Sequence, residues 1–443
     1  MKAIYVKWPN FTKSWILKGK NEIGIKKATK NVFLFRLWTV FSGLIVLISV
    51  PLNLSSSEQG YYFLFVSILA LQVFFELGLS QALIQFVTHE YYKNLEKLKV
   101  TIQFFKNIYK YIAIVYVISL VFGGLIFFRN DIFFFEKKYY LIYIILILLN
   151  GFNIYQNINL CFHDSCNRME YSYMHRLIQS VIGNLLLIVM LYYGMGLWSF
   201  IGLPLASVFL SSIWLRKNKL IYDVEGPIKV NYKKIAKEIL PFQWRIAVSW
   251  ISGYLVFQLF VPMTYKQYGA IEAGKLGLTM AAFNAMLSVV MGITSATNPD
   301  IIKNIVQGDK KKLMIILNKL ISITGLLTFI FSIIMITIIF YGQENNIDFI
   351  KRFLDPKITL VIGIITVINS VIFNLASFMR AHREEPMMLQ SLTMGILTAL
   401  DIYFFIEKGI LTVLVIYLII TITIALPWTV INFIKYKYRA YET

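Results

Sequence analysis

The sequence predicts an all-α polytopic membrane protein, in which about twelve transmembrane helices form two parallel six-helix lobes around a central cavity. Hydrophobic residues make up 58% of the 443 residues and charged residues only 15%, whereas soluble domains carry about 25% charged residues. The apolar residues also fall in runs of about twenty, the length at which a helix spans a bilayer. Finally, the polar gaps between these runs alternate between basic and basic-poor. Most of the chain is therefore expected to lie in lipid.

The apolar runs divide evenly around a basic linker. Six spans are expected near 32–52, 61–87, 108–128, 139–160, 174–193 and 196–214. Six more are expected near 239–262, 270–296, 314–341, 358–379, 387–405 and 410–432. The predicted organisation is a basic tail at 1–31, an N-terminal lobe at 32–215, a basic linker at 216–238, a C-terminal lobe at 239–434 and a basic tail at 435–443.

The distribution of charge predicts the orientation. The formal net charge is +20, and the lysines and arginines gather in every second gap, as they do in cytoplasmic loops. Both tails and the linker belong to the basic set, so both termini are expected in the cytoplasm. Because the charge follows the gaps and forms no single stripe, nucleic acid is not an expected partner.

The composition also disfavours catalysis and metal binding. The two cysteines, Cys161 and Cys166, lie in one predicted cytoplasmic gap and are expected to be free thiols. His163 lies between them, but no second pair of ligands accompanies them, so no metal or other cofactor is expected. No outward gap is longer than about twenty residues, too short for a catalytic region of the usual size. There is also no P-loop or nucleophile elbow, and no enzyme activity is expected.

The two halves resemble each other in sequence. Arg36 lies in the first span and Arg245 in the seventh, and the next spans open with Glu-Gln-Gly at 58–60 and Glu-Ala-Gly at 272–274. Both halves start on the same side, which predicts a parallel repeat with its axis along the membrane normal. A substrate is then expected near the midplane between the lobes.

Charged residues within spans are expensive in lipid and are therefore functional candidates. Glu76 lies near the middle of the second span, and the spacing of Gln72, Glu76 and Ser80 places all three on one helix face. Glu76 is a candidate proton or cation site, although a hydrogen-bonded structural role is an alternative. Lys275 and Asp401 lie near outer span ends and are expected to be interfacial.

Two further sets of polar residues are candidates for substrate contacts. Arg36 and Arg245 occupy matching places and either reach the inner surface or bind an anionic head group, since guanidinium matches phosphate oxygens. Polar faces in the fourth and tenth spans are either sugar contacts or helix–helix hydrogen bonds. They consist of Asn150, Asn153 and Asn157 in one and Ser370, Asn374 and Ser377 in the other.

Two local motifs resemble a known family. Residues 76–86 (ELGLSQALIQF), with Ser80, Gln81 and Gln85, and residues 380–386 (RAHREEP), with Arg380 and Arg383, resemble polysaccharide-biosynthesis flippases of the Wzx type. These belong to the multidrug/oligosaccharidyl-lipid/polysaccharide superfamily, which includes the MATE antiporters. By span count and repeat, the resemblance covers essentially the whole chain.

The resemblance implies a flippase that moves undecaprenyl-pyrophosphate-linked oligosaccharide repeat units to the outer leaflet of the bacterial inner membrane, for O-antigen (lipopolysaccharide) or capsule. It implies as partners the lipid-linked oligosaccharide, membrane lipids, a polysaccharide polymerase and a chain-length regulator. The family's cationic cavity would correspond to Arg36 and Arg245. The lipid II branch usually has fourteen spans, and about twelve here disfavour a peptidoglycan role. The alternative is a cation-coupled MATE-like multidrug antiporter, whose site would favour acidic and aromatic residues.

Overall fold

A computed structural model describes residues 14–93, 95–129, 137–218, 232–382 and 386–442. All regular elements in these residues are helical, with no strand. Eleven helices in the described chain are long and apolar enough to span a membrane. One of them, Ile246–Ile305, has 60 residues. Since a single crossing needs only about twenty, this segment is long enough for two crossings, and it covers most of the predicted seventh span and all of the predicted eighth. The chain is a multi-pass membrane protein, and the predicted all-α fold class is confirmed.

Most helices follow the predicted spans closely. The N-terminal half contains α1 (Ser14–Asn53), α2 (Ser56–Leu69), α3 (Gln72–Glu76), α4 (Leu79–Lys93), α5 (Leu95–Phe127), α6 (Lys137–Ser165), α7 (Met169–Tyr192), the short 3-10 helix η1 (Gly196–Ile201) and α8 (Gly202–Lys217). The C-terminal half contains α9 (Tyr232–Phe257), α10 (Phe260–Gln307), α11 (Lys310–Glu344), η2 (Ile350–Arg352), α12 (Pro356–Arg380), α13 (Met388–Phe405), η3 (Ile406–Lys408), α14 (Ile410–Ile420), the π-helical η4 (Thr421–Ala425) and α15 (Leu426–Glu442).

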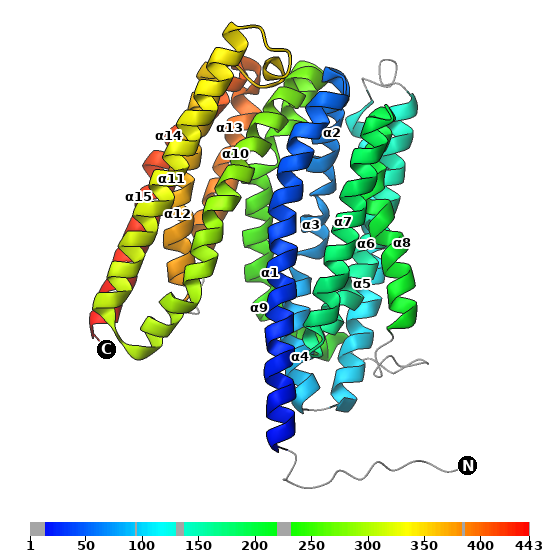
Figure 1. Ribbon diagram of the computed structural model, residues 1–443, viewed down its shortest axis with the longest axis vertical. Coiled ribbons are helices and arrows are strands. Elements are labelled where there is room, and N and C mark those ends of the chain that lie inside the picture. The colour runs from blue at the N-terminus through cyan, green and yellow to red at the C-terminus, as the bar shows by residue number, and fades with distance from the viewer. Residues whose placement is uncertain (1–13, 94, 130–136, 219–231, 383–385, 443) are drawn as a thin grey trace.

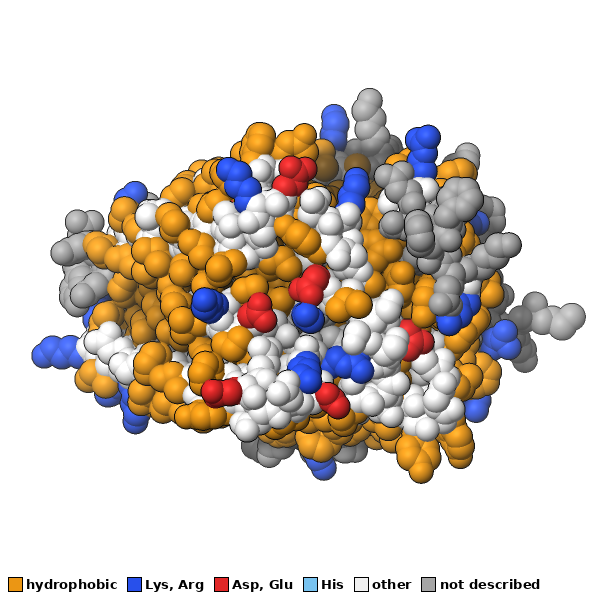
Figure 2. Space-filling model, turned by 90° about the horizontal axis from the view of Figure 1, so that it is seen from above, with side chains coloured by type: hydrophobic (Ala, Val, Ile, Leu, Met, Phe, Trp, Pro, Cys, Tyr) orange, Lys and Arg blue, Asp and Glu red, His pale blue; other side chains and the backbone are white. Residues whose placement is uncertain are grey.

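The two halves stand side by side (Figure 1). Helix α1 begins and α15 ends at the same end of the molecule, which we call the inner end. At the opposite, outer end, α2 meets α10. Seen from that side, Figure 2 shows acidic and basic side chains interspersed near the centre and hydrophobic side chains around the rim. This is the pattern expected of a polar cap surrounded by lipid.

The predicted second span, 61–87, is not one helix. The chain turns at Ala70–Leu71 and breaks again at Leu77 and Gly78, whose φ angles of 49° and 71° are left-handed. The expectation that Ser80 shares a helix face with Gln72 and Glu76 is therefore wrong, because the break lies between Glu76 and Ser80. The first part starts regularly, since Ser55 and Glu58 form a capping box at the start of α2.

Glycines let α2 and α10 pack closely at the outer end. A Cβ on Gly60 would collide with the Ala270 carbonyl, and a Cβ on Gly274 would lie 2.8 Å from the Gly60 nitrogen. Gln59 Nε2 donates to the Gly274 carbonyl at 3.0 Å, and Arg352 donates to the Leu54 carbonyl at 2.9 Å. Side chains larger than hydrogen would separate these backbones, so this contact holds the halves together at the outer end.

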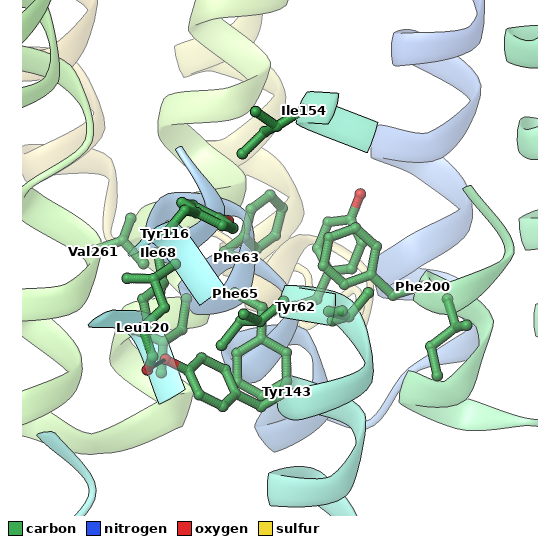
Figure 3. Close-up of a cluster of buried hydrophobic side chains, with 14 of the residues drawn as sticks. Tyr62, Phe63, Phe65, Ile68, Tyr116, Leu120, Tyr143, Ile154, Phe200 and Val261 are labelled. Atoms are coloured by element: carbon green, nitrogen blue, oxygen red, sulfur yellow. Dashed lines mark hydrogen bonds between the residues drawn. The ribbon is translucent and has the colours of Figure 1, made fainter. Parts of the chain in front are cut away.

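An aromatic core fixes the outer part of the N-terminal half (Figure 3). Phe65 of α2 packs against Tyr143 of α6 with ring centroids 5.5 Å apart, and Tyr62 packs against Phe200 of η1 at 4.7 Å. Tyr116 of α5 is also fully buried there. Aromatic pairs stabilise beyond the area they bury, so this core positions the polar helices that lie toward the inner end.

Candidate functional site

A polar cavity lies within the N-terminal half, between α1, α3, α6, α7 and α8. Its volume is about 410 Å³, within the usual range for small-molecule pockets. All three asparagines predicted on α6 line it. The described lining consists of Phe35, Thr39, Gln72, Asn150, Asn153, Ile154, Gln156, Asn157, Leu160, Arg176, Gln179, Ser180, Leu203, Ser207 and Ser211. Most of these residues carry an amide or a hydroxyl group.

A chain of hydrogen bonds connects the cavity wall to Glu76. Asn150 Nδ2 donates to Gln72 Oε1 at 3.2 Å and to the Tyr116 hydroxyl at 2.7 Å. Gln72 Nε2 in turn donates to the Glu76 carboxylate, one helical turn along α3. Glu76 is 6% exposed, so its carboxylate lies behind the wall and contacts the cavity through Gln72.

Arg176 of α7 is the charged residue among the described residues of the lining. Its guanidinium donates to Asn157 Oδ1 at 2.9 Å and to Asp164 Oδ2 at 3.1 Å. Asp164, near the end of α6, also accepts a hydrogen bond from the Ser172 hydroxyl. The arginine is thus already neutralised by a buried carboxylate, and the cavity is polar without a large net charge.

The wall formed by α7 and α8 offers further amides and hydroxyls. Gln179 donates to the Ser207 carbonyl at 3.1 Å and to the Ser211 hydroxyl. Gln156 of α6 donates to the Ser212 hydroxyl at 2.7 Å. These groups both donate and accept hydrogen bonds, which suits a ligand that carries many hydroxyl groups.

Aromatic rings gather near the inner ends of α6, α7 and α8. The Trp214 ring lies 4.7 Å from the His175 ring, nearly parallel to it, and 4.7 Å from the His163 ring. Cys161 and Cys166 are buried free thiols, as expected. Within the described residues, no group of three or more His, Cys, Asp and Glu side chains could hold a metal ion.

The other predicted site residues lie away from this cavity wall. Arg36 is exposed on α1, between Phe35 and Thr39, which both line the cavity. Arg245 belongs to α9, but its side chain lies outside the described part of the structure.

The two motifs that carry the family resemblance lie on other surfaces. Ser80 is half-buried at the start of α4, and Gln81 and Gln85 are exposed on that helix. Arg380 is exposed in the last turn of α12, and Arg383 lies outside the described residues. The structure therefore gathers the three asparagines, with Glu76 behind them, and does not bring the motif residues into this wall.

Two residues were misjudged or missed from the sequence. Asp401 lies near the end of α13, but it is 4% exposed, and neither carboxylate oxygen has a hydrogen-bond partner among the described residues, a burial that the sequence did not indicate. Lys275 is partly exposed and pairs with Glu272 at 2.8 Å. Arg176 was missed as a cavity residue, although an arginine inside the predicted span 174–193 is itself a functional signal.

Comparisons with known proteins connect this architecture to one group of transporters. A MATE multidrug transporter of the MOP superfamily, in an inward-facing conformation, matches with a TM-score of 0.63 and 13% identity, over 92% of this chain and 95% of its own. The lipid II flippase MurJ, in an inward closed conformation, matches with a TM-score of 0.66 and 16% identity, over 93% and 90%. No family model and no curated relative matches the sequence.

The chain has the fold of the MOP superfamily transporters. A further match to this fold is a transporter from Pyrococcus furiosus, with a TM-score of 0.54, 13% identity and coverage of 98% and 99%, described as having a binding pocket of reverse polarity that suggests a different function. The MOP fold therefore accommodates pockets of different polarity, and the side chains of each pocket must be considered individually.

Proposed function

We propose that this protein is a flippase that moves an undecaprenyl-pyrophosphate-linked oligosaccharide from the cytoplasmic to the outer leaflet of a bacterial inner membrane, by alternating access. The observation that carries the proposal is the amide- and hydroxyl-lined cavity of the N-terminal half. Sugars present neighbouring hydroxyls that both donate and accept, and Asn150, Asn153 and Asn157 supply complementary amides. Both termini are then cytoplasmic, and a polysaccharide polymerase and chain-length regulator are the proposed downstream partners.

The charge of the cavity supports a neutral sugar ligand. A cationic drug would be held best by carboxylates facing the ligand, but Asp164 is engaged by Arg176 and Glu76 by Gln72. A pyrophosphate would need an uncompensated cation, which the Arg176–Asp164 pair does not supply. In this proposal the pyrophosphate contacts Arg36, which is exposed on α1, and Arg245, while the sugars enter the cavity.

The test measures the leaflet distribution of the lipid-linked oligosaccharide in cells with and without the protein. Loss of the protein is expected to trap the glycan lipid on the cytoplasmic leaflet. Expression of the wild-type protein in these cells is expected to release it. Asn153→Ala and Asn157→Ala together are expected to slow release about tenfold or more, since removed hydrogen bonds each contribute on the order of 1 kcal/mol. Asn159→Ala is the matched control, because Asn159 lies on α6 but outside the described lining.

A cation-coupled multidrug antiporter is the second candidate, favoured by the buried Glu76 beside the cavity. If the glycan distribution is unchanged without the protein while export of small cationic compounds falls, this second function replaces the first.

Glu76 has the same proposed role, binding of a coupling cation or proton, in both candidates. Glu76→Gln is expected to abolish the response of transport to an imposed ion gradient. A full response in that variant would remove the coupling role and leave the cargo question open.

A further inference from the structure

Helix α5 is longer than one crossing of a bilayer requires. It has 33 residues and is therefore about 50 Å long, whereas the hydrocarbon core of a bilayer is about 30 Å thick. Figure 1 shows that α4 and α5 reach further toward the inner end than α8 does. Counting about twenty residues back from the outer end of α5 at Phe127 places the inner boundary of the hydrocarbon near Lys106. The first third of α5 is then expected among the lipid head groups and in water.

One row of side chains on α5 changes from basic to apolar at this boundary. Residues four apart lie on the same face of a helix, and this row contains Lys106, Lys110, Ile114, Ile118 and Phe122. The three apolar members are large and exposed, as expected of side chains that face lipid. Among the two lysines, Lys106 is half-buried and Lys110 is exposed. The same face of α5 therefore contacts lipid tails in its outer part and reaches the head groups with lysines in its inner part.

The protein supplies little negative charge to this face. Glu96 is the single acidic residue in the sequence of α5. Lys97 is paired with the buried Glu90, with 3.0 Å between Nζ and Oε1. Lys99 and Lys110, in contrast, are exposed and form no ion pair within the described chain. A negative charge outside the protein would therefore complement this part of α5.

We propose that Lys99, Lys106 and Lys110, the lysine row of α5, bind the phosphate of an anionic phospholipid in the leaflet at the inner end. The long flexible stem of lysine lets its ammonium group reach a phosphate from a position just inside the hydrocarbon. Tyr111, which is 66% exposed beside Lys110, lies at the level where tyrosine rings favour the head groups. Lipids with a net negative charge are expected to be preferred, since the attraction is electrostatic. The proposal does not depend on the cargo.

The first test measures phospholipid binding to the purified full-length protein by native mass spectrometry. The wild-type protein is expected to retain phosphatidylglycerol in preference to phosphatidylcholine. Lys106→Gln with Lys110→Gln is expected to lower the affinity for phosphatidylglycerol about tenfold or more, since each lysine near a membrane surface contributes about fivefold. Lys106→Arg with Lys110→Arg keeps the charge and is expected to keep the preference.

The matched control removes the same charge from exposed lysines near the outer end. Lys266→Gln with Lys357→Gln changes one lysine on α10 and one at the start of α12, and is expected to leave the affinity nearly unchanged. If the control lowers the affinity as much as Lys106→Gln with Lys110→Gln does, only the net charge matters and the lysine row is not a binding site. An unchanged affinity after Lys106→Gln with Lys110→Gln would also overturn the proposal.

The second test separates a phospholipid from a polyprenyl pyrophosphate as the occupant. A polyprenyl pyrophosphate without sugars is added to protein that carries bound phosphatidylglycerol. Because α5 contributes no residue to the described lining of the N-terminal cavity, the added pyrophosphate is expected to leave the phosphatidylglycerol in place. If the pyrophosphate instead displaces the phosphatidylglycerol, and binds more weakly to the variant Lys106→Gln with Lys110→Gln, the lysine row is a site for the pyrophosphate lipid and the phospholipid assignment is wrong.

Discussion

Helix α6 in the N-terminal half and helix α12 in the C-terminal half each carry three small polar side chains along one face. On α6, Asn150, Asn153 and Asn157 line a cavity. On α12, Asn374 is completely buried and its amide is fully engaged: Nδ2 donates to Thr324 Oγ1 at 2.9 Å and to the Ser370 carbonyl at 2.6 Å, and Oδ1 accepts from Thr294 at 2.6 Å.

The difference comes from the neighbouring helices. Thr294 of α10 and Thr324 of α11 are short hydroxyl side chains that reach Asn374 directly and close the space around it. The helices facing α6 present long side chains, such as Gln72 and Arg176, together with short ones, such as Ser207, around an open cavity. The same polar pattern thus lines a cavity in one half and forms buried helix–helix hydrogen bonds in the other.

The buried charges also differ between the halves, and they give the largest predicted effect. Asp164→Asn leaves Arg176 without its carboxylate partner, and breaking a buried pair typically costs about 3 kcal/mol or more. Arg176 is partly exposed to the cavity, so we expect the lower end of that range, measured as a fall in the melting temperature of the purified protein. The double variant Asp164→Asn with Arg176→Gln is expected to recover most of the loss. Equal losses in the single and double variants would show that the pair does not stabilise the cavity.

Asn374 provides the next largest effect. Asn374→Leu leaves the hydroxyls of Thr294 and Thr324 without their side-chain partner, and we expect a loss of about 1–2 kcal/mol in stability. Asn153→Leu, on the cavity wall, is expected to change stability by less than about 0.5 kcal/mol but to slow transport. The measurement is thermal unfolding and transport per folded molecule for both variants. Equal stability losses would contradict the contrast between the two faces.

Asp401 is expected to shift stability in the opposite direction. Its carboxylate is buried without a hydrogen-bond partner among the described residues, and an unpartnered buried polar group costs about 1–3 kcal/mol. Asp401→Leu should therefore raise the melting temperature, by about 1 kcal/mol of stability once the change in side-chain shape is included. A lower melting temperature in this variant would show that the carboxylate has a stabilising ligand in solution.

The helical fold could be predicted from the sequence because a bilayer requires each crossing to be an apolar helix of about twenty residues. Apolar runs of the right length predicted the helices, and charge alternation predicted that α1 and α15 share one end, as Figure 1 shows. The rules describe whole spans, so they missed the break at Leu77 and Gly78. Leu77 takes a left-handed φ of 49° only because the surrounding tertiary contacts, including Gln243, hold it there.

The candidate site was only partly predictable for a related reason. A helical pattern shows that Asn150, Asn153 and Asn157 share a face, but not what that face meets. Whether a polar face lines a cavity or is buried in hydrogen bonds between helices depends on side chains from helices distant in sequence. Thr294 and Thr324 are such side chains for Asn374. Arg176 and Asp401 show the same limit, since their burial and pairing follow from neighbouring helices.

The smallest predicted effect separates two lysines that both form partly exposed ion pairs. Lys275 pairs with Glu272 one turn away on α10, whereas Lys97 connects α5 to α9 through Glu238. Such pairs contribute about 0–1 kcal/mol, so Lys275→Gln and Lys97→Gln should both leave the melting temperature nearly unchanged. Only Lys97→Gln is expected to alter the transport rate, because its ion pair joins the two halves, whose relative movement the proposed alternating access requires, and a small energy changes a two-state ratio several-fold. If both variants behave alike in transport, the contact at Lys97 is structural in the same sense as the one at Lys275.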